Sequence, residues 1–336
     1  MEINKEALDE IFRYSSSFRP FTRETLSISK AYYKNDLCLV LGAGVSVASN
    51  IPQWDELVST LMIHALQEKL ENGRNLPLEQ LRHLSEITLD KNQSPLIQMR
   101  FIKTILEIED SNFVNIVHSA LYKNEIVYNT ELVNSICALC DGKYGARVKR
   151  IITYNFDNII EQYLKQKYIR HNVISSDKDI AKSGELNIYH VHGYIPLDNS
   201  EPSSSIVFSE EDYHKIYNNV YHWSNIAQLN SFRENTCLFI GCSLNDPNIR
   251  RLLDASIKKQ HYAILARKKD YSKLGDSIDK SVVEEYIKLY EKKIEEYYSS
   301  IGIKVIWVNN FSEIDDVLEA IGVNIMFNED LLHYVD

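Results

Sequence analysis

Long hydrophobic runs and an excess of positive charge are both missing from this sequence. No apolar stretch approaches the roughly 18 residues of a membrane-spanning helix, so we expect no contact with a membrane. The first twelve residues, MEINKEALDEIF, begin acidic and contain no apolar core of a signal peptide. The net charge of −10 argues against direct binding of nucleic acid, which needs a cationic face, but it does not exclude a local basic pocket.

Cysteine is also scarce, with 5 residues in a chain of 336. The number is odd, and Cys38 and Cys237 lie in apolar runs typical of strands, which indicates free thiols in a reducing, cytoplasmic environment. Cys137 and Cys140 form the one Cys-x-x-Cys pair, and a single pair cannot complete a tetrahedral metal site. We therefore expect both to pack in a helical core, and we expect no bound metal.

The composition, 44% hydrophobic and 25% charged, allows a sizeable core, and we expect one α/β domain over residues 1–336. Short runs rich in Val, Ile and Leu are apolar on both faces, which is typical of central strands in a parallel sheet. The strands are expected at residues 37–41, 150–154, 188–192, 205–208, 237–240, 261–266 and 303–308.

Helical patterns alternate with several of these strands, at residues 54–72, 157–168, 247–259 and 280–300. This alternation predicts an α/β fold with a doubly wound, mostly parallel, Rossmann-like sheet. Residues from about 75 to 147 carry helical patterns and no convincing strand, so we interpret them as a helical insertion. The segment 196–205, PLDNSEPSSS, has the composition of a flexible loop.

A third glycine is missing from the turn after the first expected strand. The sequence there is Gly-Ala-Gly-Val-Ser at 42–46, and Val47 stands where the dinucleotide fingerprint has its last glycine. The acidic residue expected about 20 positions later is missing as well. Two interpretations stay open, a turn whose backbone amides approach a phosphate and a simple chain reversal. Ser46 either caps the next helix or donates to a ligand.

Small and polar residues also follow the other expected strands, and ligands of open parallel sheets bind beyond such strand ends. Asn155 and Asp157 follow the second strand, where each is alternatively a cap of the helix containing NIIEQYL. His190 and His192 share one face of a strand, and a buried, hydrogen-bonded histidine is the usual alternative for either. A metal site built on this pair lacks a third ligand. The segment 241–247, GCSLNDP, follows a further strand.

Five motifs, GAGVS, TYNFD, HVHG, FSEEDY and FIGCSLNDPNIR, occur in this order over about residues 37–253. Together they resemble the sirtuin-like NAD-binding domains of bacterial proteins, including those of antiphage defence systems. The resemblance implies catalytic roles for Asn155, near the nicotinamide ribose, and for His192, which contacts ribose hydroxyls. It places Asp157 near the nicotinamide amide. The remaining NAD contacts that it implies are Gly42, Ala43, Gly44 and Ser46 at the diphosphate and adjoining ribose, and Gly241 and Ser243 at the adenosine.

The chain departs from the protein deacylases among the sirtuins. Those enzymes carry a zinc module of two Cys-x-x-Cys pairs soon after the His-Gly strand, and this sequence has no cysteine between His192 and Cys237. The resemblance therefore implies an NAD hydrolase, with NAD as its substrate and nicotinamide and ADP-ribose as products. A non-catalytic module that binds NAD or ADP-ribose is the alternative, and an NAD-dependent protein deacylase is less favoured.

Relatives of this type deplete NAD in antiphage defence and must stay silent until they are triggered. The resemblance therefore implies a homo-oligomer, or a partner encoded in the same operon, such as a ring-forming ATPase or an Argonaute-like protein.

Overall fold

A computed structural model describes residues 22–89, 93–107, 110–198, 200, 206–256, 259–267 and 278–327. Contact clustering divides the chain into two compact units, which are described separately below. Unit 1 comprises Met1–Val40, Glu131–Ile151 and Leu229–Asp336, and unit 2 comprises Leu41–Thr130 and Ile152–Gln228. The expectation of one domain with a helical insertion stays a prediction.

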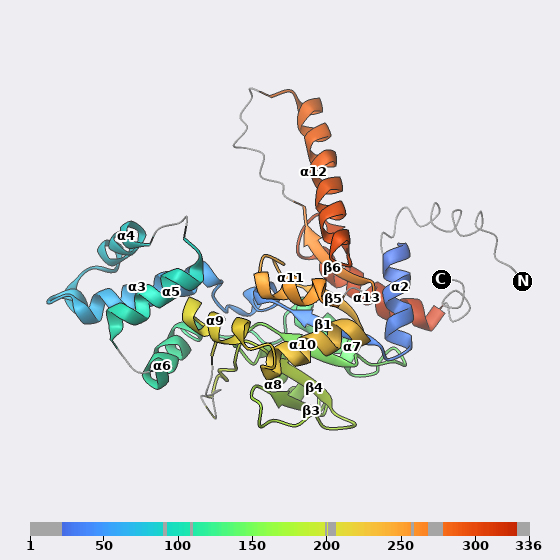
Figure 1. Ribbon diagram of the computed structural model, residues 1–336, viewed down its shortest axis with the longest axis horizontal. Helices are drawn as coiled ribbons and strands as arrows, with labels where there is room; N and C mark the ends of the chain where they lie inside the picture. The colour runs from blue at the N-terminus through green and yellow to red at the C-terminus, as the bar shows by residue number, and fades with distance from the viewer. Residues whose placement is uncertain are drawn as a thin grey trace, which may run out of the picture. The chain divides into compact units, whose positions relative to one another are not determined.

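Within the described residues, the strands form one seven-stranded sheet in the order β3-β4-β2-β1-β5-β6-β7 (Figure 1). β3 pairs with β4, β5 with β6 and β6 with β7, each in a parallel register. The chain passes from β1 to β2 on one side and later to β5 on the other, which is the doubly wound arrangement. The predicted α/β fold is confirmed. The strands are β1 (Leu37–Leu41), β2 (Arg150–Thr153), β3 (His171–Ile174), β4 (Leu186–His190), β5 (Thr236–Ile240), β6 (His261–Ala266) and β7 (Ile303–Val308).

Two strand predictions need correction. The strand expected at 205–208 is wrong for residues 206–208, since Val207 and Phe208 are buried without forming a strand, and Ser205 lies outside the described residues. The strand expected at 188–192 is β4, which begins and ends two residues earlier, so that His192 lies beyond the strand. β3 was not predicted because it is a half-exposed edge strand with a polar sequence, HNVI.

Unit 1 packs helices around β5, β6 and β7, and α13 contacts both α2 and α7. The Tyr32 hydroxyl lies 2.9 Å from the carbonyl oxygen of Leu139 and 2.8 Å from that of Ala146, and so joins α2 to α7 and the loop after it. A Cβ at Gly322 would lie 2.3 Å from the ring of Tyr144, so α13 approaches that ring too closely for a larger residue. The helices are α2 (Arg23–Tyr33), α7 (Glu131–Cys140), α11 (Pro247–Asp254), α12 (Lys280–Ser300) and α13 (Glu313–Phe327), and α10 (Trp223–Glu234) crosses the unit boundary.

Unit 2 holds β3, β4 and most of the expected helical insertion. The helix α3 contacts α4, α5 and α6, and α5 contacts α9. An aromatic cluster lies in its core, where the rings of Phe156 and Phe208 are 4.4 Å apart and Trp54 and Phe113 pack against Phe208. The helices are α3 (Trp54–Lys69), α4 (Leu78–Thr88), α5 (Pro95–Leu106), α6 (Asp110–Leu121), α8 (Ile159–Gln166) and α9 (Glu210–Asn218).

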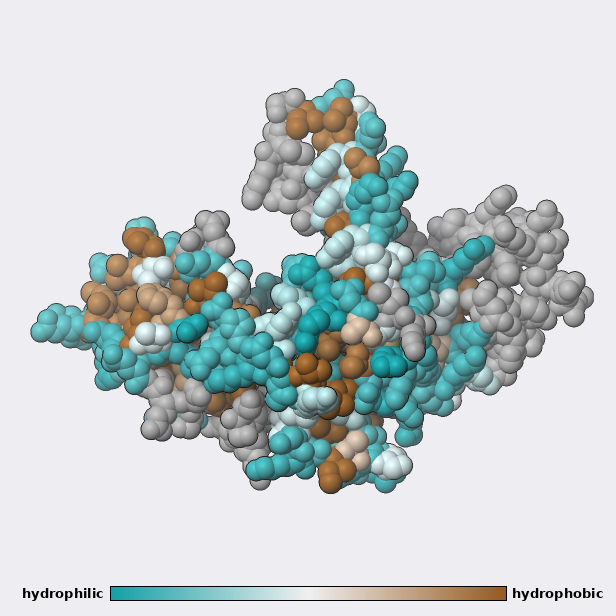
Figure 2. Space-filling view, viewed as in Figure 1, coloured by the Kyte–Doolittle hydropathy of each residue, from teal (hydrophilic) through white to brown (hydrophobic). Residues whose placement is uncertain are grey.

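Figure 2 shows apolar side chains on the surface of the helices of the expected insertion. Ile87 on α4 is 69% exposed and Phe101 on α5 is 47% exposed. Among the residues that the structure describes, no helix is long and apolar enough to cross a membrane.

Candidate functional site

The turn after β1 contains a buried serine, Ser46. All five residues of β1 are buried, and the chain leaves the strand through Gly42 into a single helical turn, Ala43–Val45. The Ser46 side chain is 2% exposed and makes no capping hydrogen bond to the next helical turn, Val47–Ser49. The cap interpretation of Ser46 is therefore wrong. The amides that open a helical turn lack acceptors within it, so those of Ala43 and Gly44 suit an anion.

Asn155, just after β2, is bound to this turn through its side chain. Its Nδ2 donates to the carbonyl oxygen of Gly42 at 3.1 Å and to Oγ of Ser46 at 3.0 Å. The carbonyl can only accept, which identifies this atom as the amide nitrogen. The side chain therefore does not cap α8, and the helix-cap alternative for Asn155 is wrong. Its other atom, Oδ1, is buried and has no hydrogen-bond partner in the described structure.

A buried acceptor without a partner costs free energy, and a ligand donor or a water relieves this cost. Oδ1 of Asn155 is therefore suited to accept a hydrogen bond from a hydroxyl group or from a bound water.

Asp157 also makes a hydrogen bond with the Ser46 side chain and is 6% exposed. Burial raises the pKa of its carboxyl to about 6, and hydrogen bonds from Ser46 and from the Ile159 amide oppose that shift. The carboxylate accepts from the N–H of Ile159, the first residue of α8, at 3.2 Å, while the N-cap position itself is Asn158. The same side chain belongs to the network of Ser46 and Asn155, and its hydrogen bond to α8 does not exclude a ligand contact.

His190, at the end of β4, is 1% exposed and has both ring nitrogens against oxygen atoms. Its Nδ1 lies 3.0 Å from the backbone carbonyl oxygen of Asn155, and its Nε2 lies 2.7 Å from Oε1 of Glu161 on α8. His190 is thus a buried, hydrogen-bonded histidine, which was the alternative to a ligand-binding role for this residue.

His192 follows two residues later and is half-buried. Its ring packs edge-on against Tyr154, the neighbour of Asn155, with 4.9 Å between ring centroids. The Tyr154 hydroxyl donates to Oε1 of Gln228 at 2.5 Å, which fixes the phenol ring. Gly193 then turns the chain with φ +108°, a conformation that favours glycine, and its N–H donates to the carbonyl of His190.

Gly241 and Ser243 belong to unit 1. Gly241 follows β5 with φ +67°, which again favours glycine. Ser243 is exposed, and its Oγ accepts weakly from the Asn245 amide at 3.4 Å. Their adenosine contacts stay a prediction. Unit 2 alone brings together Gly42, Ser46, Asn155, Asp157 and His192, with the exposed Ala43 and the half-exposed Gly44 in the same turn.

The cysteines are all free thiols. Cys137 and Cys140 are each 2% exposed on α7, and burial raises the pKa of Cys140 far above its usual value, which keeps it a neutral thiol. Among the residues that the structure describes, no group of three or more His, Cys, Asp or Glu side chains is arranged to hold a metal ion.

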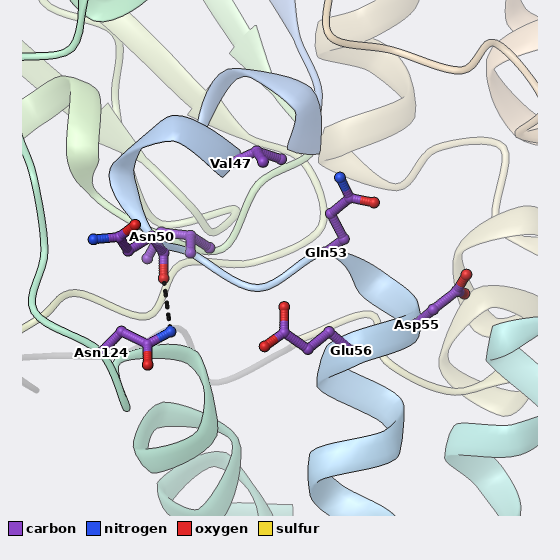
Figure 3. Close-up of a pocket in the computed structure, with 7 residues that line it drawn as sticks. Val47, Asn50, Gln53, Asp55, Glu56 and Asn124 are labelled. Carbon is purple, nitrogen blue, oxygen red and sulfur yellow. Dashed lines mark hydrogen bonds between the residues drawn. The ribbon is translucent and has the colours of Figure 1, made fainter. Parts of the chain in front are cut away.

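A cavity of about 370 Å³ lies beside the second helical turn, Val47–Ser49 (Figure 3). Asp55 and Glu56 give its lining a negative character, which Lys123 partly neutralises through an ion pair with Glu56 at 2.8 Å. Two carboxylates repel a diphosphate, so this cavity does not suit the phosphates of a nucleotide. The lining residues are Val47, Asn50, Ile51, Gln53, Asp55, Glu56 and Asn124.

Sequence reasoning missed Glu161, Tyr154 and Gln228 as neighbours of the site. Glu161 carried one signal, because it lies within the otherwise apolar stretch NIIEQYL, where a buried carboxylate needs a partner. Tyr154 and Gln228 carried none, although Gln228 is buried in the structure.

Three comparisons with known proteins found similar proteins. Residues 149–306 match the SIR2-like domain family. The chain is 25% identical over 311 residues to the NAD(+) hydrolase ThsA of Enterococcus faecium, covering 87% of this chain and 56% of that protein. It therefore spans about half the length of this curated relative. A solved structure described as "Structural Basis for the Mechanism and Regulation of Sir2 Enzymes" has a TM-score of 0.39 and 11% identity, covering 91% of this chain and 98% of that one. Residues 149–306 are therefore similar to a SIR2-like domain.

Proposed function

We propose that this chain hydrolyses NAD at the bond between nicotinamide and ribose, releasing nicotinamide and ADP-ribose. The observation that carries the proposal is the side chain of Asn155, which is held by Gly42 and Ser46 while its Oδ1 keeps a free, buried acceptor. The relation to the NAD(+) hydrolase ThsA and the match to the SIR2-like domain support it.

In the proposed reaction, the C1′–N bond of NAD breaks and its electron pair stays on the nicotinamide nitrogen, which becomes neutral. Water forms the new bond to C1′ and loses one proton. Oδ1 of Asn155 accepts a hydrogen bond from this water or from a ribose hydroxyl, which orients the reactants. A ring nitrogen of the half-buried His192 accepts the proton, or the ring contacts the ribose hydroxyls.

The other predicted residues have supporting roles in this proposal. The amides of Ala43 and Gly44, beside Gly42 and Ser46, contact the diphosphate. Asp157 contacts the nicotinamide amide, and Gly241 and Ser243 contact the adenosine. NAD is the substrate, and no metal takes part. Depletion of NAD in antiphage defence, a cytoplasmic location, self-assembly, and an operon partner such as a ring-forming ATPase or an Argonaute-like protein stay predictions.

Chromatographic measurement of free nicotinamide tests the proposal. The purified chain is incubated with NAD, alone, with an acyl-lysine peptide, and with the product of the neighbouring gene. Nicotinamide and ADP-ribose released without any peptide support hydrolysis. Release that requires the peptide indicates deacylation, and NAD binding without release under all three conditions indicates a non-catalytic binding module.

A further inference from the structure

Two buried residues, His190 and Glu161, are linked to the backbone of Asn155 and not to its side chain. His190 lies against the backbone carbonyl oxygen of Asn155, and Glu161 lies against the far side of the His190 ring. The exposed fractions are 1% for His190 and 5% for Glu161, so both polar groups are removed from water.

The positions of the protons on His190 and Glu161 follow from the atoms that the His190 ring contacts. The carbonyl of Asn155 can only accept, so Nδ1 of His190 carries a proton. Nε2 then either donates to the Glu161 carboxylate or accepts from the protonated carboxyl. In both arrangements every polar atom in the contact is satisfied, and the pair carries no net charge. Removing either partner leaves a buried polar group unsatisfied.

The His190–Glu161 pair contacts the backbone just after β2, where Asn155 lies. β4 ends at His190 and β2 ends at Thr153, so neither ladder fixes the peptide after Asn155. The Nδ1 contact fixes that carbonyl, and with it the starting point of the Asn155 side chain. Glu161 in turn holds the plane of the imidazole from the first turns of α8.

We infer that His190 and Glu161 are positioning residues: they fix the backbone of Asn155 so that its amide stays on Gly42 and Ser46 and its Oδ1 stays directed to the substrate. This inference rests on the proposed function only for its kinetic consequence. Neither residue needs to touch NAD, because both act through Asn155.

Two substitutions of His190 separate positioning from general stability. In His190→Asn, the shorter amide places a donor near the former Nδ1, so the contact with Asn155 is kept and that with Glu161 is lost. In His190→Gln, the longer amide reaches toward Glu161 and loses the Asn155 carbonyl. Each variant keeps one of two buried hydrogen bonds, so their melting temperatures are expected to fall together.

The first readout does not depend on activity. The side-chain amide protons of Asn155, observed by nitrogen-15 NMR on the full chain, exchange slowly with solvent because both are hydrogen-bonded. We expect slow exchange in His190→Asn and faster exchange in His190→Gln. Equal exchange in the two variants overturns the positioning role, even if the wild-type chain never cleaves NAD.

The second readout is kinetic. We expect His190→Gln to lower kcat by about 10²-fold with little change in KM, and His190→Asn to lower it by less than about tenfold. Equal losses, or wild-type kcat in His190→Gln, overturn the inference. If no substitution at position 190 folds, two variants of Glu161 test the inference instead. The amide of Glu161→Gln can donate to Nε2 of a neutral His190, so we expect kcat to stay close to wild type. Glu161→Ala removes this contact, so we expect kcat to fall. A wild-type chain that releases no nicotinamide contradicts the proposed function and leaves the exchange result standing.

Discussion

The side-chain nitrogen of Asn155 lies 3.0 Å from the hydroxyl oxygen of Ser46, and this contact joins the end of β2 to the turn after β1. Ser46 also donates to Asp157, so one hydroxyl serves an amide on one side and a carboxylate on the other. The geometry decides a question that the sequence left open, since Asn155 faces the glycine turn and not the start of α8.

Asn155→Ala is expected to lower NAD turnover by at least about 10²-fold, because the acceptor for water or ribose is removed. The melting temperature should change little, since the lost hydrogen bonds lie in a partly buried turn. Turnover and melting temperature are measured on the same preparation. The matched control is Asn172→Ala, which removes an amide bonded to Ile180 and Asn187 on the edge strand and should leave turnover unchanged. An active but destabilised Asn155→Ala protein contradicts the catalytic role.

His192→Ala is expected to abolish nicotinamide release while the protein stays folded. The ring is half-buried and packs edge-on against Tyr154, so its loss removes little of the core. Nicotinamide release and the circular dichroism spectrum are compared with those of His171→Ala, which removes a histidine from the edge strand β3. Near wild-type release from His192→Ala excludes this residue from the mechanism.

Asp157→Asn is expected to change how stability depends on pH. The folded protein binds the Asp157 proton with a pKa of about 6 and the unfolded chain with one near 3.8, so wild-type stability falls as the pH rises through this window. The penalty reaches at most about 3 kcal/mol above pH 6, and the asparagine variant does not carry it. Urea unfolding of both proteins from pH 4 to pH 8 measures the difference.

The expected result is a variant that is more stable than the wild type at pH 8, with a gap that closes toward pH 4. A gap independent of pH contradicts the assignment of this titration to Asp157. In the proposed function the variant also binds nicotinamide less well, which would appear as a higher KM for NAD.

The cysteines of α7 are expected to act as core residues and not as metal ligands. Prolonged treatment with EDTA should leave the melting temperature unchanged, because the four ligands of a structural zinc site are not available in the sequence. Cys140→Ser should destabilise the protein by about 1 kcal/mol, with or without EDTA. Stoichiometric zinc in the purified chain, measured by mass spectrometry, is the result that contradicts this prediction.

Much of the fold could be predicted because its central strands are unambiguous. β1 is apolar along its whole length and β6 is mostly apolar after His261, and both appear in the structure with the predicted bounds. The prediction was wrong at two places, residues 206–208 and β3, for opposite reasons. Residues 206–208 are apolar because they are buried in the core of unit 2, without strand pairing, whereas β3 is a true strand whose exposed edge allows His171 and Asn172.

The sequence predicted the residues of the candidate site but not the hydrogen bonds that connect them. The rule that ligands lie beyond strand ends selected Asn155, Asp157 and His192 from the sequence alone. It could not tell that the Asn155 amide would turn to Gly42, because an asparagine at a helix start is usually a cap. Nor could it pair His190 with Glu161, since the two lie 29 residues apart and meet only through the packing of α8.

The free acceptor of Asn155 limits which side chains this position tolerates. The side chain must donate two hydrogen bonds from one nitrogen and present an acceptor at the same short reach. Aspartate has the acceptors but no donors, glutamine is one methylene too long, and serine offers a single donor. In a saturation library screened for NAD-dependent toxicity, position 155 should therefore accept asparagine alone, while position 172 on the sheet edge tolerates many residues.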